Sequence, residues 1–167
     1  MKPLKRDPLY LRNVIFGIED SLVSTVGLLS GIAVESIPYK TILLTGTVYI
    51  VVEAFSMAVG SFLSEESAEE YQVKREVTGS RAVSGAVVMF VSFVIAGFIP
   101  VLPYLFLSGS PGLYSSIALS LLALFILGYV NGRISKIKPW RRSLRMVLLG
   151  GCAILVGVLV GRSVRFG

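Results

Sequence analysis

The sequence predicts an all-α integral membrane protein with five transmembrane helices. Hydrophobic residues make up 54% of the 167 residues, and the mean hydropathy is +0.78. Charged residues make up only 16%, compared with about 25% in an ordinary soluble domain. The apolar residues also gather in runs of about 20, which is the length that a helix needs to cross the hydrocarbon core. We therefore expect a single membrane domain over residues 1–167.

Five segments are long and apolar enough to span a membrane. Helices are expected because backbone groups in lipid must be hydrogen-bonded within the segment. The segments are separated by Pro38, by a Ser-Gly-Ser-Pro-Gly stretch at 108–112 and by Lys138-Pro139, whereas the connection at 65–81 is longer and strongly charged. The predicted spans cover residues 13–34, 41–64, 82–107, 113–132 and 144–161.

Basic residues lie mainly on one side of these spans. All of the 16 Lys and Arg residues except Lys40, Arg162 and Arg165 fall in the amino-terminal segment or in the second and fourth connections. The positive-inside rule then predicts a cytoplasmic amino terminus and a carboxyl terminus that is outside or lumenal. Because the net charge of +6 is explained by this topology, we expect no nucleic-acid partner. Short connections without a recognisable targeting segment favour a prokaryotic plasma membrane.

The sequence has no pattern that is typical of an enzyme. It contains no histidine and one cysteine, Cys152, which excludes an imidazole metal site, a histidine base and an intramolecular disulfide. No nucleophile–base pair or cofactor motif is recognisable. We therefore expect a protein that is not an enzyme and that has no resident cofactor.

Three carboxylates, Glu19, Asp20 and Glu53, interrupt the apolar spans. An intramembrane carboxylate costs roughly 2.5–3.5 kcal/mol on insertion scales, so such residues usually face a bundle interior or an aqueous path. The alternative for Glu19 and Asp20 is a position near the helix end, where the side chain reaches the headgroups. Glu53 lies roughly 16 Å from Ser64 along a helix, near the midplane of the membrane.

Met57 lies four residues after Glu53, on the same side of a helix. In antiparallel spans, Asp20 and Met57 are expected at similar depths, roughly 10–12 Å from the cytoplasmic face. Carboxylates suit hard cations, and a thioether suits transition metals. We therefore predict that Asp20, Glu53, Met57 and Glu19 line a path for a first-row divalent metal. For an isolated methionine, ordinary packing would be the simpler explanation.

An acidic cluster follows the second span. Glu65, Glu66, Glu69 and Glu70 form two pairs at i,i+4 spacing, and no helix breaker occurs before Gly79. These residues could gather metal ions at a cytoplasmic entrance by raising the local cation concentration. The alternative is a solvated helix face that is balanced by neighbouring basic residues.

The motifs resemble those of the vacuolar iron transporter family of iron and manganese transporters. Residues 13–31 are similar to the family's acidic, glycine-rich first helix, and residues 53–64 (EAFSMAVGSFLS) are similar to its second-helix signature. Residues 97–104 and 127–133 are similar to the ends of its third and fourth helices. The resemblance covers nearly the whole chain.

The resemblance implies a five-helix fold that forms a homodimer, with the metal path at the subunit interface. It also implies export of Fe²⁺ or Mn²⁺ from the cytosol in exchange for protons. Asp20 and Met57 fall on path positions of the family. A passive cation channel and a non-transporting membrane scaffold of the same fold remain as alternatives.

The chain departs from the family pattern in two respects. Many members carry a Glu- and Met-rich metal-binding domain between the second and third helices, whereas the connection here is only residues 65–81. This is therefore a short form, in which Glu65 to Glu70 would be the remnant of that domain. In addition, Ser21 and Ser61 stand where the family commonly has Gly and Glu. The second change removes a carboxylate and so bears on metal choice and transport.

Overall fold

A computed structural model describes residues 8–34 and 37–165. Each of its five helices is long and apolar enough to cross a membrane, and the described residues form no strand. This confirms the expected fold class, and each predicted span falls on one helix to within one residue. The helices are α1 (Pro8–Ala33), α2 (Tyr39–Val73), α3 (Ser80–Phe106), α4 (Ser110–Ile134) and α5 (Pro139–Arg165).

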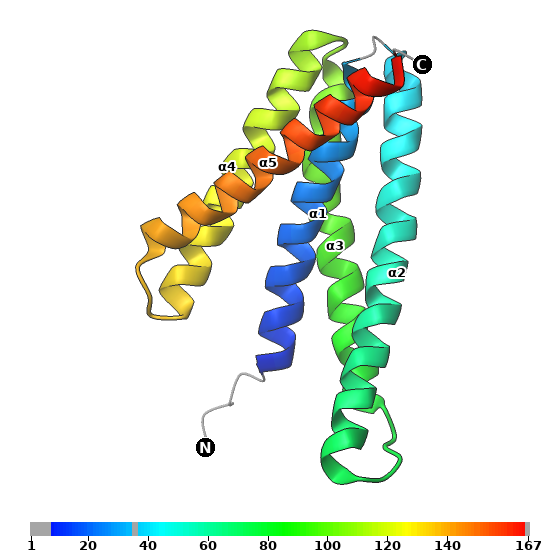
Figure 1. Ribbon diagram of the computed structural model, residues 1–167, viewed down its shortest axis with the longest axis vertical. Coiled ribbons are helices and arrows are strands. Elements are labelled where there is room, and N and C mark those ends of the chain that lie inside the picture. The colour runs from blue at the N-terminus through cyan, green and yellow to red at the C-terminus, as the bar shows by residue number, and fades with distance from the viewer. Residues whose placement is uncertain (1–7, 35–36, 166–167) are drawn as a thin grey trace.

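The first helix, α1, is the centre of the bundle. It contacts each of the other four helices, whereas α2 contacts only α1 and α3. Half of the apolar window of α1 is buried within the chain, compared with 17% of the window of α5. In Figure 1, α2 and the α4–α5 pair lie on opposite sides of α1. They diverge toward the end of the bundle where α1 begins, which we call the basic end because most Lys and Arg residues lie there.

Glycines allow α5 to cross α1 with its backbone in direct contact. A Cβ atom added at Gly157 would collide with the carbonyl oxygen of Gly27, and one added at Gly161 would collide with that of Gly31. Small residues at four-residue spacing are a usual basis for close helix approach in membranes. The glycine pair of α1 and the glycine pair of α5, each at four-residue spacing, therefore form a single contact.

Hydroxyl groups add hydrogen bonds between α3 and its neighbours. Ser21 Oγ of α1 donates to the carbonyl oxygen of Phe93 at 2.7 Å, and Ser116 Oγ of α4 donates to that of Pro100 at 2.6 Å. The Ser21 hydroxyl fits because the facing residue is Gly97, where an added Cβ would lie only 2.8 Å from that oxygen. Ser21, at a position where the resemblance implies a glycine, thus forms a hydrogen bond between α1 and α3.

The second helix continues well past its predicted span. The acidic segment is helical as expected, and the connection to α3 is reduced to residues 74–79. At 1.5 Å per residue, the 35 residues of α2 extend about 52 Å, which exceeds the hydrocarbon core of about 30 Å. The last turns of α2 therefore project beyond the hydrocarbon region. Lys74 ends the helix in the left-handed conformation, with φ of 55°.

The glycine crossing can be tested with Gly157→Ala. The new methyl group would lie against the Gly27 carbonyl oxygen, so α5 would have to move away from α1. We expect a destabilisation of about 1–3 kcal/mol, seen as a lower melting temperature of the purified protein in detergent. The control is Gly151→Ala on the same helix, where no heavy atom lies within 4 Å of the added Cβ. Equal melting temperatures for the two variants would contradict the close crossing.

Candidate metal path

A cavity of about 930 Å³, lined by both polar and apolar residues, opens at the basic end, between α1, α2 and the α4–α5 connection. Its polar lining includes Asn13 and Glu19 from α1, Ser61 and Ser64 from α2, and Arg142 from α5. Because α2 makes no contact with α4 or α5, the cavity has no continuous wall between these helices. The site therefore combines a buried polar face on α1 with an open side next to α2.

Two of the predicted path residues, Glu19 and Met57, line this cavity from α1 and α2. Both side chains are partly buried. Ser56 and Gly60, one residue before and three after Met57, line the same wall and are exposed. Glu19 thus lies at this cavity, opposite the Met57 wall of α2.

The other two predicted residues, Asp20 of α1 and Glu53 of α2, are near enough for their charges to interact. Successive helical residues point about 100° apart, so Asp20 does not share the cavity wall with Glu19. It lies close enough to Glu53 for the two carboxylates to repel each other. Tyr49, one helical turn before Glu53, interacts with both acids and with Ser24. We call Asp20 and Glu53 the acidic pair; along α2 it lies farther from the basic end than the cavity wall at Met57.

The predicted path residues fall into two groups. Glu19 of α1 and Met57 of α2 line one cavity, and the charge of Asp20 on α1 interacts with that of Glu53 on α2. On α2, Tyr49, Glu53 and Met57 follow one another at four-residue spacing and so form a stripe. This stripe connects the cavity to the acidic pair.

Arg142 is a residue of the cavity that sequence analysis considered only as a marker of topology. Its positive charge interacts with Glu19 across the cavity. In the amide orientation that satisfies all neighbours, the Asn131 oxygen accepts hydrogen bonds from Arg142 Nε at 3.2 Å and from an Arg142 terminal nitrogen at 3.3 Å. Asn131 lies near the end of α4 and is buried, and no local pattern in the sequence linked it to Arg142. The cavity therefore contains a fixed cation opposite its carboxylate.

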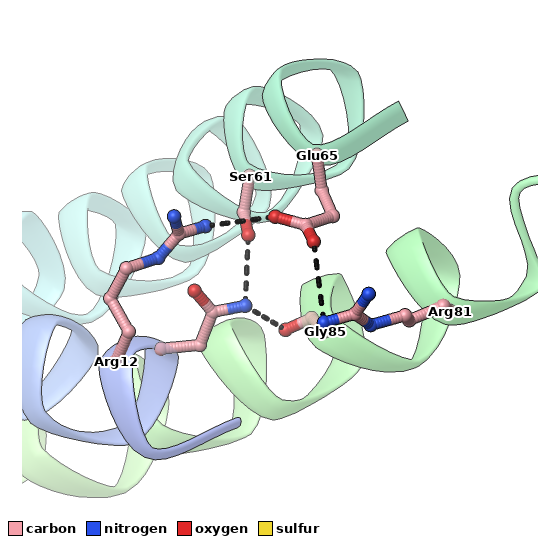
Figure 2. Close-up of polar contacts among 6 residues, drawn as sticks. Arg12, Ser61, Glu65, Arg81 and Gly85 are labelled. Carbon is pink, nitrogen blue, oxygen red and sulfur yellow. Dashed lines mark hydrogen bonds and ion pairs between the residues drawn. The ribbon is translucent and has the colours of Figure 1, made fainter. Parts of the chain in front are cut away.

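Ser61 is hydrogen-bonded where the family commonly has a glutamate. Asn13 Nδ2 donates to Ser61 Oγ at 3.0 Å and to the carbonyl oxygen of Gly85 at 2.8 Å (Figure 2). All three residues are buried, and a Cβ at Gly85 would come within 2.9 Å of Asn13 Nδ2. This neutral network joins α1, α2 and α3 at the side of the cavity.

The acidic cluster after the second span is partly used in structural contacts. Glu65 lies 3.4 Å from Arg12 and 3.9 Å from Arg81 (Figure 2), and Glu66 lies against Gly79 at the start of α3. A helix start favours such a negative charge. Glu69 and Glu70 are farther along α2 and partly buried. Within residues 8–34 and 37–165, no three Asp, Glu or Cys side chains gather closely enough to hold a metal ion.

The VIT family sequence model matches residues 11–79 and 68–162 of this chain. Vacuolar iron transporter homolog 4 of Arabidopsis thaliana is 31% identical over 153 residues, which are 85% of this chain and 77% of that protein. Vacuolar iron transporter homolog 3 of the same plant is also 31% identical, over 85% of this chain and 76% of its own length.

A longer relative matches over a smaller region. Vacuolar iron transporter 1 of Oryza sativa subsp. japonica is 29% identical over 86 residues, which are 51% of this chain. The matched part is only 34% of the rice protein. The two Arabidopsis relatives, in contrast, match across most of this chain. Together with the five membrane helices, these similarities show that the chain belongs to the VIT family.

Proposed function

We propose that this protein exports Fe²⁺ or Mn²⁺ from the cytosol in exchange for protons. Its family supports metal transport in general, since its relatives are named vacuolar iron transporters. The single observation that carries the specific proposal is the acidic pair, two carboxylates on neighbouring membrane helices whose charges interact, adjacent in sequence or by one helical turn to the cavity residues Glu19 and Met57. Intramembrane carboxylates of this kind typically mark ion paths.

The acidic pair provides a chemical basis for coupling. Two ionised carboxylates at short range are mutually unfavourable, and either a divalent cation or a proton relieves the repulsion. Because a carboxylate must be deprotonated to bind metal, the two cargoes exclude each other at the same group. In the proposed cycle, metal enters through the cavity past Glu19 and Met57 and reaches Asp20 and Glu53. Protons from the other side then replace it.

The direction of export follows from the topology. The excess of basic residues supports a cytoplasmic location for the basic end, so that the cavity would open to the cytosol. The short connections favour a prokaryotic plasma membrane, although the named relatives are plant proteins called vacuolar. The assignment to a prokaryotic plasma membrane is thus part of the proposal.

We also place the path at the interface of a homodimer. The cavity in one chain is incomplete between α2 and the α4–α5 pair, which do not touch. Ser56 and Gly60 of α2 are exposed at that side. Since the described part of one chain gathers no three acidic ligands, a second copy could both close the cavity and complete the coordination of the ion.

The transport role can be tested with Asp20→Asn. Purified protein in liposomes should accumulate Mn²⁺ or Fe²⁺ when a proton gradient is applied, and Asp20→Asn should reduce uptake to the level of empty liposomes because one carboxylate of the acidic pair is lost. The control is Glu76→Gln, which neutralises an exposed carboxylate of the 74–79 connection. Parent-like uptake by Asp20→Asn would exclude the proposed role. Uptake that is insensitive to the gradient would indicate a passive channel.

The role of the thioether can be tested with Met57→Leu, a change that nearly conserves volume. Leucine cannot bind a metal, so the preference for Mn²⁺ over Mg²⁺ in competition uptake should decrease. Met146→Leu removes a buried sulfur that does not line the cavity and serves as the control. An unchanged ratio of Mn²⁺ to Mg²⁺ uptake in Met57→Leu would rule out the thioether as a selective ligand.

The fixed cation of the cavity leads to a further prediction. Arg142→Gln removes a positive charge that competes with metal for Glu19, so Mn²⁺ should bind more tightly. For an interaction of about 1 kcal/mol, the expected gain is about fivefold in Kd by titration calorimetry. Arg141→Gln is the matched control, because Arg141 does not line the cavity. Unchanged or weaker binding by Arg142→Gln would contradict the competition.

A further inference from the structure

A second pocket, lined almost entirely by basic residues, lies at the α4–α5 connection. It encloses about 480 Å³. Apart from Ile137, its lining consists of five basic residues: Lys136, Lys138, Arg141, Arg142 and Arg145. We call it the basic pocket. Such a concentration of like charge around one hollow is unfavourable unless an anion or solvent compensates for it.

Within residues 8–34 and 37–165, no salt bridge connects an acidic side chain to the basic pocket. The salt bridges within the described ranges connect Glu65 with Arg12 and Arg81, on other helices. Among the pocket residues, Arg142 faces Glu19, and the other four basic side chains are exposed. The positive-inside rule accounts for basic residues in this connection, but it does not require them to surround one pocket.

The basic pocket borders an apolar groove on the outer face of α5. The groove has a volume of about 400 Å³ and shares Arg141 and Arg145 with the pocket. Its other lining residues are Leu144, Leu148, Leu149 and Cys152. These positions recur every three to four residues and so form one helix face. The three leucines are exposed, as expected for a surface in contact with lipid chains.

We propose that this composite surface binds one anionic phospholipid. The phosphate group would lie among Lys138, Arg141 and Arg145, and an acyl chain would follow the groove toward Cys152. Clusters of basic residues next to membrane helices are suited to acidic headgroups. Trp140 lies at the start of α5, exposed and edge-on to Phe125, where an aromatic residue can mark the headgroup level. The site does not depend on the proposed metal transport.

The groove distinguishes a lipid from a soluble anion. A free phosphate ester could occupy the basic pocket but would gain nothing from the leucines of α5. A zwitterionic lipid could follow the groove but would carry no net charge to match the five basic side chains. Only an anionic lipid satisfies both parts of the surface.

Native mass spectrometry of the full-length protein in detergent tests this inference. The probes are dioleoyl-phosphatidylglycerol and dioleoyl-phosphatidylcholine, which have the same acyl chains. The double variant Arg141→Gln/Arg145→Gln should weaken phosphatidylglycerol binding about 25-fold, since each basic residue near the headgroup contributes about fivefold. The matched control is Lys74→Gln/Arg75→Gln, two exposed charges of the other connection at the basic end, which should bind like the parent.

A charge-conserving double variant distinguishes the loss of charge from misfolding. Arg141→Lys/Arg145→Lys should retain most of the phosphatidylglycerol binding that the glutamine variant loses. Equal loss in the Lys74/Arg75 control would show general attraction to a basic surface and would overturn the proposal. Equal binding of phosphatidylcholine by the parent would also overturn it, and so would displacement of the lipid by glycerol phosphate at similar concentration.

Discussion

The architecture depends on the central position of α1. A helix that contacts four others must offer a surface that several backbones can approach, and the small residues of α1 provide it. Gly27 and Gly31 admit the backbone of α5, and Gly17 lies against Met89 and Ser92 of α3. Ser21 extends this close packing with a hydrogen bond to α3. In a membrane, where apolar burial between helices contributes little, such packing and interhelical bonds hold a bundle together.

The same central position explains how carboxylates are tolerated within the spans. Glu19 and Asp20 are adjacent in sequence, so the helix turns them toward different neighbours. Glu19 faces the cavity and Arg142, whereas Asp20 faces Glu53 on α2. One carboxylate is partly compensated by a fixed cation, and the other is opposed by a like charge. In the proposed path, a mobile cation therefore relieves more charge repulsion at the acidic pair than at Glu19.

Much of the architecture was predictable because apolarity and length directly determine membrane spans. The five helices and the helical acidic segment after Ser64 follow from these properties. The spacing of residues along each helix was also predictable from residue counts. The rotation of each helix was not, because it depends on packing against several partners at once. For this reason the sequence did not show which neighbour each acid would have, whereas in the structure Glu19 lines a cavity with Met57 and Asp20 interacts with Glu53.

Sequence analysis missed some residues of the site for the same reason, because their positions depend on the packing of several helices. Arg142 belongs to a basic connection, and nothing local indicates that Asn131 holds it at the cavity. Asn13 likewise reaches Ser61 and Gly85 only through the packing of three helices.

The most direct test of the metal path is an anomalous difference map from crystals of this protein grown with Mn²⁺. The proposed path predicts a peak within the bundle, between the cavity wall at Glu19 and Met57 and the acidic pair. A peak confined to the Glu65–Glu70 segment, with none between α1 and α2, would contradict it.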